Sequence, residues 1–257
     1  MLPERRRRLE ARLVALTDVH ELRGVRPGVA GGLEIGALCT HAHLAAEPSV
    51  RDFCPALADA FGRVATLRVR NQATLGGNLA LADPAHDPPA ILIALGARAL
   101  LAHRDRRREL DIADLARGPF APTLAGGELI TAVRIPPLDG LRVAHEKFVV
   151  RAGSFREQAG YPTVSCGVAL ELDEAGRCLR ARVGLSGVHR FPVRAYATEE
   201  LLRHERLTPP VVHMAARAAG GALDPLDDER GSADYKRAMA AVWIERALLR
   251  AVGDRDG

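Results

Sequence analysis

The 257-residue sequence is poor in aromatic residues, which make up 4% of the chain. None of them is interspersed among the arginines of its two basic clusters, residues 5–8 and 104–108. Nucleic-acid-binding surfaces combine basic residues with aromatic platforms or with a helix that enters a groove. No nucleic-acid partner is therefore expected, and the arginines are interpreted as surface groups that face solvent or another subunit.

Cysteine is also scarce, and the cysteines present do not form a motif. The four residues have no C-x-x-C pairing and no histidine at zinc-finger spacing: Cys39, Cys54, Cys166 and Cys178. They are expected to be reduced and unligated, and no metal site is predicted. His41 and His43 lie two positions apart on an expected helix, so their side chains point to different sides. Both are predicted to lie on a plain helix surface.

Long apolar runs are absent too. No segment approaches the length that spans a bilayer, and the arginine-rich start has no apolar stretch like that of a secretory signal. No Ser/His/Asp or Cys/His set with a recognisable local signature is present, so no catalytic residue is proposed. A cytoplasmic protein with no membrane partner is expected.

The residues that are present indicate an ordinary globular chain. Apolar residues make up 47% and charged residues 26%, and the formal net charge of +4 is a weak basic bias. Hydrophobic spacing and turn residues predict a strand at 11–16 and strands at 33–37, 97–103, 107–112 and 128–136. Helices are expected to begin at Thr40, as an N-cap, and after Pro48, and a third is expected to begin at Pro88 and to be closed by Gly96. Beyond a boundary near residues 136–140, strands are expected around 143–150, 163–172 and 180–185, and helices at 193–203, 210–221 and 233–252. This pattern predicts an α+β fold.

A glycine pair in the first half of the chain has the chemistry of a phosphate-binding loop. Gly76 and Gly77 are flanked by Thr74 and Asn78. Glycines allow the backbone to approach an anion closely, inward-pointing N–H groups form a donor nest, and Thr or Asn side chains add neutral hydrogen bonds. A glycine pair alone is more often a turn, and this one is neither a Walker A loop nor a G-x-G-x-x-G fingerprint.

The sequence around the pair is more specific. The run VRNQATLGGNLALADPAHDPPAILIALGA resembles the second FAD-binding motif of the molybdopterin-dehydrogenase FAD domains, IRNxGTIGGNLxxAxPxxDxxxxLLALxA. IGALCTHAHLA, GPF followed by ELITAVRIP, KFVVRAGS, YPTVSCGVALEL and GSADYKRAM resemble further segments of the same proteins. The chain is identified as a member of the FAD-binding (medium) subunits of the xanthine dehydrogenase and carbon monoxide dehydrogenase family of molybdenum hydroxylases.

The resemblance implies a fold. A PCMH-type FAD-binding domain would occupy residues 1–138, and a small C-terminal domain of a three-stranded antiparallel sheet with helices would occupy residues 139–257. The first domain is expected to be shortened at its N-terminus, because the family's first glycine motif, AGGxSL, would precede the opening LPERRRRLEARLVAL. Residues 30–32 echo that motif but lack the Ser-Leu that follows it, so they are interpreted as a hairpin turn.

The resemblance also implies site residues. Thr74, Gly76, Gly77 and Asn78 would contact the FAD pyrophosphate and its neighbouring sugar. Asp87 would accept hydrogen bonds from ribityl hydroxyls, and it is also suited to cap the helix that begins at Pro88.

Three more positions match the family pattern nearer the flavin ring. Ile130 would pack on the flavin, Lys147 would lie near the isoalloxazine end on an exposed strand, and Tyr161 would lie near the ring. Gly160 replaces the acidic residue that precedes this aromatic position in the family.

The implied function is electron transfer. A large molybdopterin-binding subunit would oxidise the substrate and a small 2Fe-2S subunit would relay electrons to FAD on this chain, which would pass them to a terminal acceptor. The substrate, the stoichiometry of the hetero-oligomer and the acceptor, whether NAD, a quinone or oxygen, are left open. A shortened, flavin-free scaffold in the same complex is the alternative. A basic nucleic-acid module is a distant third.

Overall fold

The computed structural model describes residues 14–150 and 160–253. The basic cluster at residues 5–8 and most of the strand expected at 11–16 lie outside these ranges. The first part of the chain is built on a five-stranded antiparallel sheet in the order β1-β2-β7-β3-β4. Its strands are β1 (Val25–Pro27), β2 (Leu33–Gly36), β3 (Arg98–His103), β4 (Arg106–Asp111) and β7 (Leu129–Ile135). Residues 30–32 form the turn between β1 and β2, as expected from the sequence.

Short helices fill the connection between β2 and β3 and pack on this sheet. They are α1 (His41–Ala46), α2 (Pro48–Phe53), α3 (Pro55–Gly62), α4 (Leu67–Arg70), α5 (Leu75–Leu81) and α6 (Pro88–Ala94). A small hairpin of β5 (Ala116–Gly118) and β6 (Ala121–Pro122) follows β4. The first hydrophobic cluster lies between the helices and the sheet and includes Ile35, Phe61, Leu92 and Val133.

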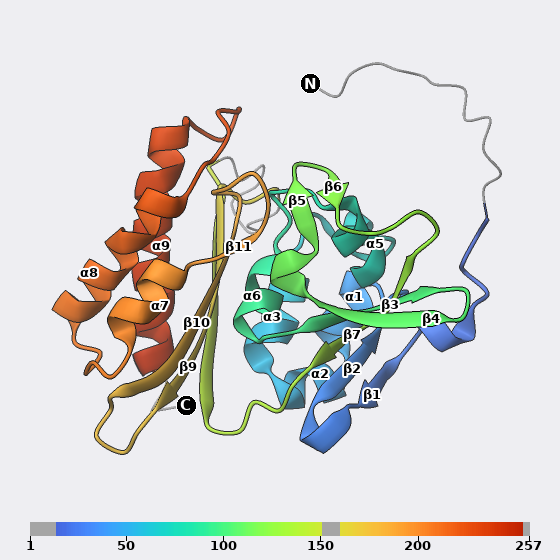
Figure 1. Cartoon of the computed structure of the whole chain (residues 1–257), viewed down its shortest axis with the longest axis horizontal. Coiled ribbons are helices and arrows are strands. Elements are labelled where there is room, and N and C mark those ends of the chain that lie inside the picture. Colours follow the sequence, from blue (N-terminus) through green and yellow to red (C-terminus); the bar gives the residue numbers. More distant parts are fainter. Residues whose placement is uncertain (1–13, 151–159, 254–257) are drawn as a thin grey trace.

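The second part of the chain is a four-stranded antiparallel sheet in the order β11-β10-β9-β8. Its strands are β8 (Leu141–Phe148), β9 (Val164–Leu172), β10 (Cys178–Ser186) and β11 (Val193–Arg194). Helices α7 (Tyr196–Leu202), α8 (Pro209–Ala218) and α9 (Ala233–Gly253) lie beside this sheet. Figure 1 shows these helices on one side of the sheet, with α6 and α3 on the other side, between the two sheets.

The expected α+β fold is confirmed, and two local expectations are wrong. The helix expected after Pro48 is two helices, because Cys54 has an extended backbone (φ −158°, ψ 97°). Pro55 follows it, and a proline disfavours the helical conformation of the residue before it. The helix expected from Val193 begins only at Tyr196, because residues 193 and 194 pair with β10 as a fourth short strand.

Local signals did locate several helix ends. Thr40 caps α1 through its Oγ1, which accepts a hydrogen bond from the His43 N–H at 3.2 Å. Helix α6 ends at Ala94, and Gly96 follows in the left-handed region with φ of 65°. Within the described ranges no helix is both long and apolar enough to cross a membrane.

Helix α6 rests directly on the backbone of the second sheet. A Cβ atom at Gly184 of β10 would lie 2.0 Å from the Ala90 carbonyl oxygen, and one at Gly167 of β9 would lie 2.5 Å from Ile91 Cα. Only glycine permits this approach. The contact holds the start of α6, and with it Asp87, against the strands of the second sheet.

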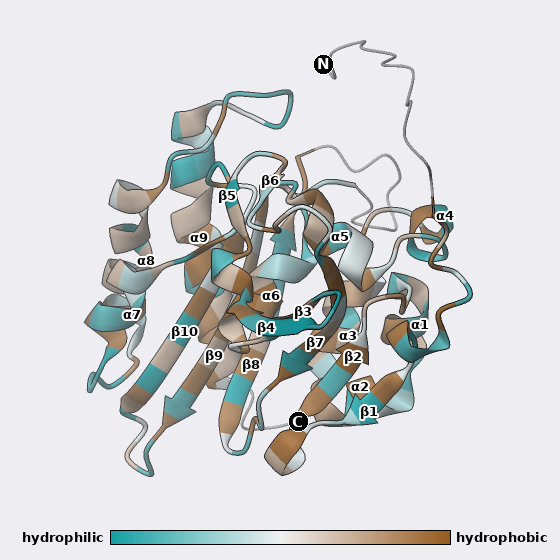
Figure 2. Cartoon of the chain, turned by 45° about the vertical axis from the view of Figure 1, so that its right-hand side comes forward, coloured by the Kyte–Doolittle hydropathy of each residue, from teal (hydrophilic) through white to brown (hydrophobic). Residues whose placement is uncertain are grey.

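Charged side chains cross the outer face of the first sheet in alternating sign. Arg26 pairs with Glu34 at 3.6 Å, Glu34 pairs with Arg134 at 3.2 Å, and Arg134 also binds Glu109. Arg98 continues the ladder, with 3.4 Å to Glu109. Figure 2 shows β4, at the end of this ladder, as strongly hydrophilic. Cross-strand pairs of this kind stabilise a sheet that has one face in solvent.

Replacing Arg134 by methionine should therefore lower the free energy of unfolding by about 1 kcal/mol, because two carboxylates lose their shared partner. Urea unfolding at low and high salt measures this, and the loss should shrink as salt screens the carboxylates. Arg203→Met is the control, since among the described residues the Arg203 guanidinium forms an ion pair only with the exposed Glu200, at 3.6 Å. Equal losses in the two variants would show that the ladder contributes nothing beyond isolated pairs.

Candidate functional site

The glycine loop begins a helix and is hydrogen-bonded to the segment that follows β2. Thr74 caps α5, with its Oγ1 accepting from the Gly77 N–H at 3.2 Å. The Gly76 N–H donates to the Ala37 carbonyl at 2.8 Å, and the Asn78 N–H donates to the Thr74 carbonyl at 2.9 Å. These amides are thus bonded within the protein, so the expected open nest of N–H donors is not what the loop presents. Gly76 instead allows close packing, since a Cβ there would lie 2.6 Å from Ala37 Cβ.

The loop borders a cavity of about 380 Å³. Five of the residues predicted from the sequence line it: Thr74, Gly77, Asn78, Asp87 and Tyr161. Apolar side chains that include Val64, Val69 and Leu81 form much of the remaining wall. A largely apolar cavity with a few convergent polar groups is the usual form of a cofactor site.

Three predicted residues do not line this cavity. Gly76 lies behind it, in contact with Ala37. Ile130 is buried in the first hydrophobic cluster, on β7. Lys147 was expected on an exposed strand, and this is wrong, because its side chain is 0% exposed.

Lys147 lies directly behind Asp87 and forms a buried ion pair with it. Its Nζ donates to Asp87 Oδ2 at 2.7 Å, to the Arg63 carbonyl at 2.7 Å and to the Gly160 carbonyl at 2.9 Å. Burial raises the pKa of the Asp87 carboxyl to about 6, with Lys147 as the main opposing influence, and burial lowers the pKa of Lys147.

Asp87 occupies the N-cap position of α6, but its side chain makes no capping hydrogen bond. The expected capping role is therefore wrong. Its carboxylate is held by Lys147 through Oδ2, and its second oxygen, Oδ1, is buried without a partner among the described residues. The pair thus fixes a carboxylate in the cavity wall with one oxygen still able to accept a hydrogen bond.

His41 is a wall residue that the sequence did not reveal. It was expected on a helix surface, yet it is 0% exposed, and its ring stacks on Phe61 with the centroids 5.7 Å apart. The His41 N–H donates to the Ala73 carbonyl at 3.1 Å, which ties the start of α1 to the glycine loop. Burial, with the nearby charges of His86 and Arg70, lowers the pKa of His41 to about 4, so its ring is neutral near pH 7.

Several buried polar atoms around the cavity have no partner within the described part of the chain. They are both ring nitrogens of His41, Oδ1 of Asn78 and Oδ1 of Asp87. A buried polar atom without a hydrogen-bond partner lowers the stability of the fold by about 1 to 3 kcal/mol. Clusters of such atoms are therefore rare in native proteins and call for an explanation. Their convergence on one cavity indicates a polar ligand, and the residues fit a cofactor that carries several hydrogen-bonding groups.

An aromatic platform forms part of the rim. Tyr161, which is 52% exposed, stacks on His86 with the ring centroids 6.0 Å apart and 11° between the planes. Arg230, which precedes α9, lies 5.7 Å from the Tyr161 ring centroid. His86 is held through Nδ1, 3.2 Å from the Asn78 carbonyl oxygen. The aromatic position was predicted, whereas His86 and Arg230 were not, because only the fold brings them together.

Two family models cover most of the chain. That of the FAD binding domain in molybdopterin dehydrogenase matches residues 1–138, and that of the CO dehydrogenase flavoprotein C-terminal domain matches residues 152–251. The carbon monoxide dehydrogenase medium chain of Afipia carboxidovorans is 32% identical over 240 residues, which are 93% of this chain and 81% of that protein. The glyceraldehyde dehydrogenase medium chain of Sulfolobus acidocaldarius is 29% identical over 236 residues, 92% of this chain and 81% of that protein.

Solved structures are also similar to this chain. A carbon monoxide dehydrogenase structure from Hydrogenophaga pseudoflava matches with a TM-score of 0.83 and 33% identity, over 91% of this chain and 79% of that chain. These matches define an FAD-binding oxidoreductase subunit. The chain belongs to the family of FAD-binding medium subunits of molybdenum hydroxylases, as the sequence resemblance predicted.

Proposed function

We propose that this chain binds FAD in the cavity of about 380 Å³ and serves as the electron-transferring subunit of a molybdenum hydroxylase. The observation that carries the proposal is the group of unpaired polar atoms of His41, Asn78 and Asp87 in one cavity wall. Thr74, Gly77 and Asn78 would contact the pyrophosphate and its neighbouring sugar, and Asp87 Oδ1 would accept from a ribityl hydroxyl.

The other predicted residues would support the site or form its rim. Lys147 would hold the Asp87 carboxylate in the wall, Gly76 would keep the loop against Ala37, and Ile130 would support the flavin from the hydrophobic cluster. Tyr161, stacked on His86, would offer an aromatic surface at the rim. The redox chemistry would be supplied by FAD when it is bound, while these side chains orient it and limit water in the cavity.

The partners follow from the family. We propose a large molybdopterin-binding subunit and a small 2Fe-2S subunit, since the relatives are named as medium chains and subunits of dehydrogenases. Electrons would pass from the clusters of the small subunit to FAD on this chain and then to an acceptor. We further propose that the FAD-binding unit spans residues 1–138 and that the second unit spans residues 139–257, each with its own hydrophobic cluster.

Titration of the purified chain with FAD tests the site. Flavin fluorescence should be quenched as FAD binds, and His41→Leu and Asn78→Leu should each weaken binding about tenfold, because each removes hydrogen bonds to the ligand. His43→Leu is the matched control, since His43 lies on the same helix, is half-exposed and, within the described ranges, pairs only with Glu47 at 3.5 Å. It should bind FAD like the unmodified chain.

Two outcomes would contradict different parts of the proposal. If the unmodified chain takes up no FAD even within its complex, the flavin-free scaffold is the better description. If it binds FAD but the His41 and Asn78 variants bind equally well, the site lies elsewhere in the chain.

A further inference from the structure

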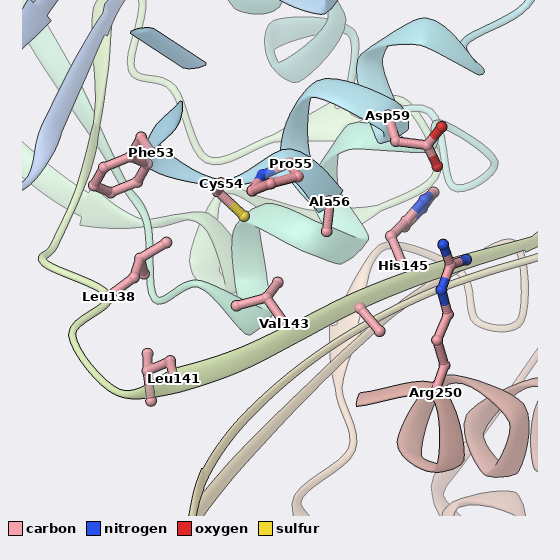
Figure 3. Close-up of a pocket in the computed structure, with 11 residues that line it drawn as sticks. Phe53, Cys54, Pro55, Ala56, Asp59, Leu138, Leu141, Val143, His145 and Arg250 are labelled. Carbon is pink, nitrogen blue, oxygen red and sulfur yellow. The ribbon is translucent and has the colours of Figure 1, made fainter. Parts of the chain in front are cut away.

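A second cavity, of about 450 Å³, lies between α3, β8 and α9 (Figure 3). It shares no lining residue with the proposed FAD cavity. Phe53, Leu138 and Leu141 lie toward one end of it, whereas Asp59, His145 and Arg250 converge at the other end. The volume is in the range of sites that hold small molecules, and the wall is divided into an apolar part and a polar part.

His145 gives the polar end a hydrogen-bond acceptor that no residue of the described ranges uses. The side chain is 1% exposed, and its Nε2 lies 2.9 Å from Ser165 Oγ. We assign the ring proton to Nε2, because the Ser165 hydroxyl donates to the Asp87 carbonyl at 3.4 Å and its oxygen then accepts from Nε2–H. The lone pair is therefore on Nδ1, which has no partner among the described residues.

The His145 ring is also neutral. Burial, reinforced by the positive charges of Arg63, Lys147 and Arg250, lowers its pKa to about 3. A protonated ring would be disfavoured beside these cations, so Nδ1 remains an acceptor under ordinary conditions. A ligand that satisfies it must bring a hydrogen-bond donor.

The charges beside His145 select against ions. Asp59 is paired with Arg63 at 3.5 Å, and an anionic group has no proton to donate to the Nδ1 lone pair, which would repel it. Arg250, whose Nη1 donates to Glu146 Oε1 at 2.9 Å, would repel a cationic group. A neutral hydroxyl avoids both penalties, because it can donate to Nδ1 and still offer an oxygen to the guanidinium side.

We propose that this cavity binds a small neutral aromatic molecule that carries a hydroxyl group, a ligand of the phenol class. The ring packs among Phe53, Leu138 and Val143, and the hydroxyl donates to His145 Nδ1. The proposal does not depend on FAD, because the two cavities have separate walls.

The test compares 4-methylphenol with p-xylene, which has the same shape but a methyl group in place of the hydroxyl. Calorimetric titration of the full chain, saturated with FAD if it binds FAD, should show 4-methylphenol binding at least about fivefold more tightly. 4-Methylbenzoate and 4-methylbenzylamine should bind more weakly than 4-methylphenol. Equal affinities for 4-methylphenol and p-xylene, no detectable binding, or a preference for either ion would overturn the proposal.

Two variants and one control locate the ligand in this cavity. Ala56→Phe projects a ring from α3 into the cavity and should abolish binding, whereas Leu81→Phe alters only the other cavity and should not. His145→Leu should remove the preference for 4-methylphenol over p-xylene while the ring still binds. Binding that survives Ala56→Phe in a folded variant, or a preference that survives His145→Leu, would also overturn the proposal. The ligand comparison on the unmodified chain decides the matter if a variant fails to fold.

Discussion

Lys147→Met is expected to lower the free energy of unfolding by about 3 to 5 kcal/mol, because it leaves the Asp87 carboxylate buried without its counter-charge. Methionine has nearly the volume of lysine, so the loss would report the charge rather than a cavity. The two carbonyls that Lys147 bonds, those of Arg63 and Gly160, would lose their donor as well. Urea denaturation followed by circular dichroism measures the change.

A double variant separates the charge from the packing. Lys147→Met combined with Asp87→Leu removes both ions, and replacing a buried pair by apolar groups is often close to neutral. The double variant should therefore be more stable than Lys147→Met alone. If instead the two substitutions destabilise additively, the pair is not coupled in the way that the 2.7 Å contact between Nζ and Oδ2 implies.

The pH dependence of Lys147→Met follows from the same contact. Burial already raises the pKa of Asp87 to about 6 in the native chain, and removal of Lys147 raises it further. A carboxyl whose pKa is raised by folding destabilises the fold when it is ionised, and this penalty is relieved as pH falls through the raised pKa. The variant should thus lose less stability relative to the native chain at about pH 5 than at about pH 8. An equal loss at both pH values would exclude the Asp87 charge as its cause.

Lys147 and His41 also show what the sequence does not determine. Thr40 and Gly96 were placed correctly because capping and a left-handed turn depend on residues that are adjacent in the chain. The burial of Lys147 depends on β8 being covered on both sides, by α9 and by α3, which are remote in sequence. A lysine on a strand gives no local signal of this, so the expectation of an exposed side chain was reasonable and wrong.

The residues of the candidate site likewise fall into those that the sequence identifies and those that only the fold brings together. The motif identified Thr74, Gly77, Asn78 and Asp87 as neighbours, because they follow one another within one loop and the helix after it. His41 joins them only because the backbone of α1 is bonded to Ala73. The sequence does place His41 directly after the N-cap Thr40. The two-residue spacing of His41 and His43, however, suggested that both lie on the helix surface. The N–H groups of the loop were likewise assigned to a ligand, since their hydrogen bonds to the segment after β2 and to the loop itself appear only in the fold.

Gly184→Ala is expected to cost about 3 kcal/mol of stability or more and to abolish tight FAD binding. The added Cβ would lie 2.0 Å from the Ala90 carbonyl oxygen and 2.9 Å from Ile93 Cβ, so α6 must move away from β10. Overpacking usually costs about 1 to 3 kcal/mol, and here the neighbour is backbone that cannot adopt another rotamer. Asp87 occupies the N-cap position of this helix, so the displacement would reach the proposed FAD cavity.

Gly220→Ala is the matched control for Gly184→Ala. A Cβ at Gly220 would have no atom within 4 Å, and its φ is not in the left-handed region, so the substitution should be neutral or slightly stabilising through the unfolded state. Thermal unfolding and FAD titration of both variants give the two readouts. Gly167→Ala should resemble Gly184→Ala, and combining the two should cost less than their sum, because both displace the same helix. A Gly184→Ala protein with native stability would mean that α6 does not rest on β10 as described, and the position of Asp87 would then need another explanation.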